Sequence, residues 1–120
     1  MRKLMAAAIG GTMLAATLAS GAAAQERTRI ARDAILGGDL AKAERTLIAD
    51  RRVYGSTPQM MLNLAAVYAR SGRTGEATAL YRQVLGHEDV LMDVTADRTA
   101  SAHTIARAGL ARLQPMLATR

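Results

Sequence analysis

A 34-residue internal repeat constrains the fold of this chain more than any other feature. Gly38 and Gly72 lie 34 positions apart, and four further pairs of positions match when the 120-residue sequence is aligned with itself at that offset without gaps. Three of the five pairs are identical and two are apolar: Gly38/Gly72, Ala31/Ala65, Ala43/Ala77, Ile30/Leu64 and Leu47/Tyr81. A repeat of this length is typical of proteins in which one small unit is stacked on further copies of itself.

Helical spacing within the second copy identifies the unit as a pair of helices. Leu64, Ala65 and Tyr68 recur at the three- and four-residue spacing of one helix face, and Ala77 and Tyr81 do the same further along. Because alanine is small, two helices that meet at Ala65 and Ala77 can cross near the lower end of the usual range of about 8–10 Å. The two segments therefore predict a tight helical hairpin.

The stretch "SGRTGE", at 71–76, stands between these two helices. In a phosphate-binding loop, four residues separate two glycines, and the second glycine is followed by Lys and then by Ser or Thr. Here only two residues separate Gly72 from Gly75. We therefore interpret the stretch as the bend of the hairpin, with Gly72 ending one helix and Thr74 capping the next. Asp39 is expected to cap the corresponding helix of the first unit.

With these features the chain resembles the tetratricopeptide repeat (TPR) family, whose unit is a 34-residue helical hairpin. The matching positions of the second unit are Leu64-Ala65, Tyr68, Ala77 and Tyr81. Met61 stands where the family has Trp, and Asp89 where it has Pro; in the first unit Arg27 and Ala34 stand at the Trp and Tyr positions. The resemblance covers about 26–89. It implies an all-α fold with about two TPR-like helical hairpins, at 26–57 and 58–89.

The chain after the second unit does not continue the repeat. The segment 86–100 has no helical stripe, and Val90 to Val94 predicts a short β-like strand and turn, as a loop or small hairpin. Ser101 then predicts the start of a C-terminal capping helix over 101–113, with Pro115 just beyond its end. Because repeat stacks need about three units for a continuous core, we expect this helix to cover the second hairpin. The alternative is an incomplete cover and a homodimer.

The first 24 residues are expected to be a signal peptide. Arg2 and Lys3 are followed by a stretch without charge that ends in three alanines at 22–24, so cleavage is predicted before Gln25. The stretch is mostly Ala, Gly and Thr, which favours cleavage over a retained membrane anchor. The mature chain, 25–120, would then be one domain that is periplasmic or secreted, without stable membrane insertion.

Composition excludes several classes of function for this mature chain. Without Arg2 and Lys3 it has 14 basic and 10 acidic residues, spread along the sequence, which fits an anionic membrane surface or an acidic partner. The absence of cysteine excludes disulfides and thiolate chemistry. A chain with three Tyr, no Phe, no Trp and no basic stripe with interleaved aromatics is not expected to bind nucleic acid.

Two groups of residues carry side chains that could form a site of chemistry. His87, Glu88, Asp89, Asp93 and Asp97 offer metal ligands, but their spacing matches no known metal-binding loop and an acidic loop is commonly solvated. The second group, Ser101 and His103, lacks a visible third member and oxyanion site. We therefore predict no catalytic residue, no metal and no cofactor, with a metal-dependent enzyme as the weakest alternative.

What remains is a surface for binding. In TPR-like proteins the inner helix faces line a concave groove that takes an extended or helical peptide. Carried over by position, the resemblance implies a groove formed by Arg29, Arg32, Leu62, Asn63, Ala66 and Arg70. Arginines can hold carboxylates in a fork, and Asn63 can pair with a peptide backbone. The expected function is a non-enzymatic adaptor of the cell envelope that binds a protein or peptide. The alternative is a structural subunit or homodimer that completes a larger complex.

Overall fold

The computed structural model describes residues 23, 26–95 and 97–118, so the expected signal peptide at 1–24 lies, but for residue 23, outside the described residues. The described chain is mostly helical with one small sheet. Residues 26–36 form the N-terminal helix. The other elements, in chain order, are α2 (Leu40–Tyr54), α3 (Pro58–Arg70), α4 (Thr74–Gly86), β1 (Leu91–Thr95), β2 (Arg98–Ser101) and α5 (Ala102–Ala118).

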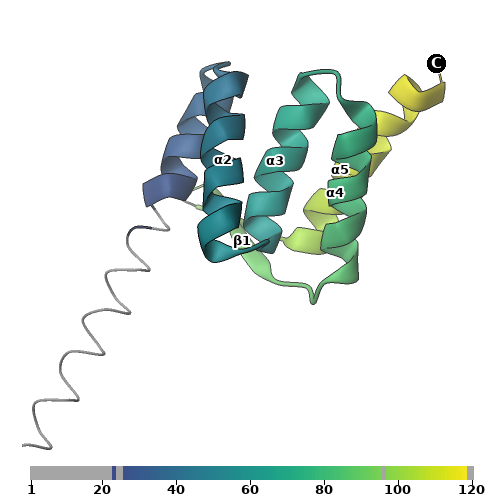
Figure 1. Cartoon of the computed structure of the whole chain (residues 1–120). Helices are drawn as coiled ribbons and strands as arrows, with labels where there is room; N and C mark the ends of the chain where they lie inside the picture. The colour runs from purple at the N-terminus through teal and green to yellow at the C-terminus, as the bar shows by residue number, and fades with distance from the viewer. Residues whose placement is uncertain (1–22, 24–25, 96, 119–120) are drawn as a thin grey trace, which may run out of the picture.

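The helices stand side by side in chain order. In Figure 1 the N-terminal helix, α2, α3 and α4 follow one another across the view, and α5 lies behind α4. The α3 helix is central, since it packs against α2, α4 and α5. The hairpin of β1 and β2 lies near the lower ends of α2 and α3 and is partly hidden by them in this view. The all-α prediction with a small β-like segment is therefore confirmed at this coarse level.

The turns that end the first helix of each unit have the same backbone geometry. Gly38 and Gly72 have φ angles of +81° and +76°, which favour glycine. The N–H of Asp39 donates to the Ala34 carbonyl at 2.9 Å. At the equivalent position the N–H of Arg73 donates to the Tyr68 carbonyl at 2.8 Å. These are the bonds of a helix that ends on a left-handed glycine, so the 34-residue offset relates two equivalent turns.

The alanines of the repeat lie at the tightest points of the core. Ala31, Ala43, Ala65 and Ala77 are all 0% exposed. Larger side chains fill the space between the crossings, and those with the least exposure are Leu47, Met61, Leu64, Val67 and Val84. This pattern agrees with the expectation that small residues set the close approach of the helices.

The contact between α4 and α5 depends on a residue without a side chain. A Cβ atom on Gly109 of α5 would lie 2.3 Å from Cζ of Tyr81, a buried residue of α4. Because a methyl group does not fit at that distance, glycine at this position lets α5 lie directly against the Tyr81 ring. Burial also raises the pKa of the Tyr81 hydroxyl above its ordinary value.

Two expectations about helix ends are wrong. Thr74 is not the N-cap of α4: Arg73 holds that position without a side-chain cap bond, and the Thr74 hydroxyl donates to the Gly72 carbonyl at 3.4 Å instead. The last helix does not end before Pro115 but includes it and runs to Ala118. By contrast, the Asp39 carboxylate caps α2 by accepting from the N–H of Lys42 at 3.1 Å, as expected.

Candidate binding cavity

A cavity of about 660 Å³ opens where three elements meet. Its lining comes from the N-terminal helix, the start of α3 and β1: Thr28, Arg29, Arg32, Thr57, Pro58, Gln59, Val90, Leu91, Met92 and Asp93. The volume falls within the range of about 300–1,000 Å³ that is typical of ligand pockets. β1 follows the second unit and the N-terminal helix opens the first, so the cavity is lined by segments that are far apart in the sequence.

Local sequence explains how each wall is positioned. Thr57 caps α3 by accepting from the N–H of Met60 at 3.2 Å, and Pro58 begins the helix, so Gln59 is fixed in its first turn. Met92 of β1 packs against the hydrophobic core and anchors the strand. On the other face of the strand, Leu91 is 78% exposed at the cavity wall.

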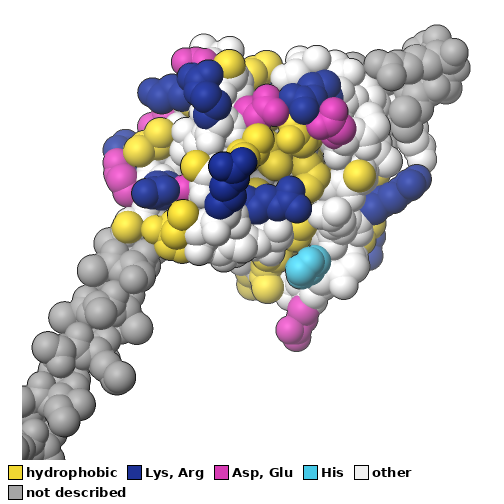
Figure 2. Space-filling model, viewed as in Figure 1, with side chains coloured by type: hydrophobic (Ala, Val, Ile, Leu, Met, Phe, Trp, Pro, Cys, Tyr) yellow, Lys and Arg dark blue, Asp and Glu magenta, His cyan; other side chains and the backbone are white. Residues whose placement is uncertain are grey.

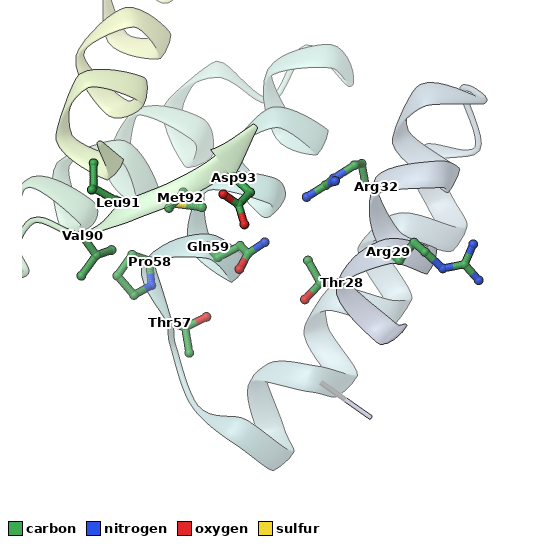
Figure 3. A pocket seen from close by; sticks show the side chains of 10 residues that line it. All are labelled: Thr28, Arg29, Arg32, Thr57, Pro58, Gln59, Val90, Leu91, Met92 and Asp93. Carbon is green, nitrogen blue, oxygen red and sulfur yellow. The ribbon is translucent and has the colours of Figure 1, made fainter. Parts of the chain in front are cut away.

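Three polar side chains, one basic, one acidic and one neutral, face one another across the cavity. Figure 3 shows the Arg32 guanidinium pointing from the N-terminal helix toward β1, with the Asp93 carboxylate and the Gln59 amide on the other side. Within the described residues, neither Arg32 nor Asp93 takes part in an ion pair. The cavity therefore presents one cation, one anion and one amide for a ligand to engage.

Of the six residues expected to form the groove, only Arg29 and Arg32 line this cavity. Arg32 faces the cavity. Arg29 also lines it, but its guanidinium points away in Figure 3 and donates to Glu26 at 2.7 Å. This hydrogen bond holds the pKa of the Glu26 carboxyl below its ordinary value. Of the two arginines that line the cavity, only Arg32 points into it.

The predicted groove residues of α3 lie away from the cavity. Leu62 is buried, with 5% of its surface exposed, and Ala66 is half-buried. Asn63 lines a second, smaller cavity of about 80 Å³ beside Tyr54 of α2. The Arg70 guanidinium donates to the carbonyl of Ile35 at 2.8 Å, which satisfies a carbonyl at the end of the N-terminal helix. These four side chains hold the helices together or line other surfaces.

Sequence reasoning missed the part of the cavity that comes from β1 and from the first turn of α3. The sequence offered Asp93 only as a possible metal ligand and gave no signal for Gln59. The available signal was the run of apolar residues in "VLMDV", because three of them remain well exposed: Val90 at 42%, Leu91 at 78% and Val94 at 37%. Exposed apolar side chains on a short strand indicate a surface that another molecule can cover.

The charges of the bend at 71–76 serve packing between helices. The Arg73 guanidinium donates to Glu76 at 2.7 Å and to Glu44 of α2 at 2.8 Å, and its Cζ lies 4.2 Å from the centre of the Tyr68 ring. The hydrogen bonds to Glu76 and Glu44 raise the pKa of Arg73. On the face shown in Figure 2, basic and acidic side chains are interspersed around a hydrophobic area.

The histidines and their acidic neighbours fix the base of the β-hairpin. The Asp89 carboxylate accepts from the backbone N–H of His103 at 3.0 Å, and the His103 ring Nε2 donates to the His87 carbonyl at 2.7 Å. The Ser101 hydroxyl is engaged with Thr104, from whose N–H it accepts at 3.1 Å. Within the part of the chain that the structure describes, no three His, Asp or Glu side chains are grouped to hold a metal ion.

Comparisons with known proteins give no relative for this chain. No family model, no curated protein and no solved structure matches it. Among the described residues, no helix has both the length and the apolar character needed to cross a membrane.

Proposed function

We propose that this chain is a non-enzymatic adaptor of the cell envelope that binds a peptide segment of another protein. The observation that carries the proposal is the cavity between the N-terminal helix, the start of α3 and β1, with Arg32, Gln59 and Asp93 around it. A peptide offers backbone amides to Gln59 and charged side chains to the other two. Apolar contact comes from Val90 and Leu91.

The charge of the cavity sets the kind of peptide that fits. Arg32 can hold a carboxylate through two parallel N–H donors, and the mature chain, with 14 basic and 10 acidic residues, has a formal net charge of +4. An acidic side chain opposite Arg32 is therefore favourable. Asp93 disfavours a second carboxylate close to β1, so we propose a segment with one acidic residue rather than a uniformly acidic one.

We also propose that the fold is TPR-like and that the chain is exported. The matched turns at Gly38 and Gly72 and the buried alanines at equivalent positions support two stacked hairpins of TPR-like type. The charge and small-residue pattern of 1–24 supports cleavage before Gln25 and a periplasmic or secreted location.

A selection of peptides followed by binding to variants tests the proposal. A displayed library of random twelve-residue peptides is selected against the full chain, and the enriched peptides are labelled and measured by fluorescence anisotropy. We expect Arg32→Glu to weaken their binding at least about tenfold, which corresponds to about 1.4 kcal/mol. Arg82→Glu is the matched control, because this substitution makes the same change of charge at an exposed position of α4. Equal binding to both variants, or no enriched peptide, contradicts the proposal.

A second candidate is a structural subunit or homodimer, favoured by exposed apolar residues of the first unit. Leu36 is 72% exposed, Val53 66% and Tyr54 42%. Exposed apolar residues on the terminal unit of a repeat stack can be covered by a further protein surface. Sedimentation of the full chain distinguishes the candidates: a monomer favours the adaptor, and a dimer lost on Val53→Glu favours the subunit.

A further inference from the structure

The register of the β-hairpin determines which backbone groups of β1 face the cavity. β1 pairs with β2 in antiparallel fashion, with Leu91 opposite Ser101 and Met92 opposite Ala100. The N–H of Ala102 donates to the Val90 carbonyl at 2.8 Å, so Val90 and Ala102 form a hydrogen-bonded pair. Hydrogen-bonded and non-hydrogen-bonded pairs alternate along an antiparallel ladder. Met92 therefore bonds to β2.

The residues on either side of Met92 direct their backbone groups the other way. By the same alternation we infer that the N–H and C=O of Leu91, and of Asp93 just before the register shift between Asp93 and Thr95, point away from β2, toward the outer edge of β1. The sheet has only two strands, so within the described residues no third strand occupies that edge. Leu91 and Asp93 both line the cavity, and the N-terminal helix stands on its far side (Figure 3).

We propose that the partner peptide binds in extended form as a third strand on the outer edge of β1. This inference depends on the proposed function, because it specifies how the peptide lies in the same cavity. Strand addition uses main-chain hydrogen bonds for affinity and alternate side chains for specificity. The outward N–H and C=O groups of Leu91 and Asp93 can form these main-chain hydrogen bonds. The side chains that line the cavity can select the alternate side chains of the peptide.

Side chains on both walls define the class of peptide. An apolar or β-branched residue beside Leu91 forms a cross-strand pair and covers a side chain that is 78% exposed. A carboxylate within reach of Arg32 forms a charge-assisted bond on the helix side. The residue next to Asp93 is neutral or basic. The partner segment is thus a short extended stretch of apolar residues with one acidic residue and no proline at the paired positions.

An N-methyl scan tests the binding mode. The probe is the tightest-binding peptide from the random twelve-residue library, synthesised as a series with one backbone N–H methylated in each member. Along an added strand, only every second peptide N–H bonds to β1. We expect methylation to weaken binding about tenfold at alternate positions and less than about twofold between them, since each affected position loses a hydrogen bond and introduces a clash.

Amide hydrogen exchange of the full chain provides a second readout. The N–H groups of Leu91 and Asp93 should become protected when the same peptide is added, whereas the N–H of Met92, already bonded to β2, should change little. A scan without two-residue periodicity, together with unprotected Leu91 and Asp93, overturns strand addition. If Arg32→Glu still weakens the peptide in that case, the cavity remains the binding site and only the binding mode is wrong. Binding that is insensitive to Arg32→Glu instead refutes the proposed function.

Discussion

The two helical hairpins share one backbone pattern but use different interactions at equivalent positions. In the first hairpin, Arg27 and Asp50 form an ion pair at 2.8 Å. In the second, Met61 and Val84 occupy the positions 34 residues further on, and both are 1% exposed in the hydrophobic core. The Arg27 and Asp50 side chains are 46% and 13% exposed.

The position of each hairpin in the stack explains this difference. The second hairpin has neighbours on both sides, since α3 contacts α2 and α5 as well as α4. Because a fully enclosed charge is costly, an apolar pair is preferred there. The first hairpin lies at the end of the stack, where Arg27 keeps contact with water and its Cζ lies 5.8 Å from the centre of the Tyr54 ring. The repeat therefore specifies backbone geometry, and the neighbours specify side-chain chemistry.

The largest effect is expected from truncation in the second hairpin. Met61→Ala removes a side chain that is 1% exposed and leaves a cavity, so it should reduce the free energy of unfolding by about 2–5 kcal/mol. Leu36→Ala, at an apolar residue of the first hairpin that is 72% exposed, is the control and should change it by less than about 0.5 kcal/mol. Urea unfolding followed by circular dichroism measures both, and equal effects would contradict the contrast between the hairpins.

Overpacking at the equivalent alanines comes next. Ala65→Leu should destabilise by about 1–3 kcal/mol, because α3 is enclosed on several sides. Ala31→Leu, at the matching position of the N-terminal helix, should cost less, since a helix at the end of the stack can shift outward. Thermal unfolding of the two variants provides the comparison. A larger loss for Ala31→Leu would show that the first hairpin is the more rigid of the two.

A smaller effect is expected when the core pair of the second hairpin is transferred to the first. In Arg27→Met with Asp50→Val, an apolar pair replaces the ion pair, and such exchanges are often neutral or stabilising. The melting temperature should stay unchanged or rise. Arg27→Met alone should lower it, because Asp50 is then left unpaired at 13% exposure. A double variant less stable than the single one would show that the ion pair has a specific role.

The smallest effect concerns the segments that follow each hairpin. A neutral Thr57 caps α3, whereas the Asp89 carboxylate accepts from the His103 N–H near the start of α5. That bond holds the pKa of the Asp89 carboxyl below its ordinary value. Ionised Asp89 therefore stabilises the fold above about pH 4, and this contribution is lost as the pH falls through the lowered pKa.

The variant Asp89→Asn isolates this contribution. Its melting temperature should be lower than that of the unmodified chain at pH 6, and the difference should shrink below pH 4. Thr57→Val is a suitable comparison, since loss of a neutral cap should lower the melting temperature by the same amount at both pH values. A constant difference for Asp89→Asn would remove the carboxylate from the account.

The sequence allowed the helical hairpins to be predicted because their signals are local or recur at a fixed offset. Alanines at 31, 43, 65 and 77 and glycines at 38 and 72 are determined by close packing and backbone conformation within one unit. The path of the last helix through Pro115 was not predicted, because a proline usually ends a helix.

The cavity could be predicted only in part. Arg32 was included by position, but Gln59 and Asp93 come from segments far apart in the chain and meet only through the fold. Asp93 lies in the hairpin at 91–101, which falls outside the repeat, so no equivalent position indicated its place. Arg70 has the chemistry of a ligand-binding residue, yet its guanidinium bonds to the Ile35 carbonyl. Composition alone does not separate these two uses of an arginine.

The most direct test of the central claim is the location of a bound peptide. A library-selected peptide with a nitroxide label at one end is added to the ¹⁵N-labelled full chain, and the loss of amide signal intensity is mapped. The account predicts the strongest losses at Thr28, Gln59 and Met92, which line the cavity on its three sides, with little change at Arg82 on α4. Losses centred on α2 and α4, with the three cavity amides unaffected, would contradict it.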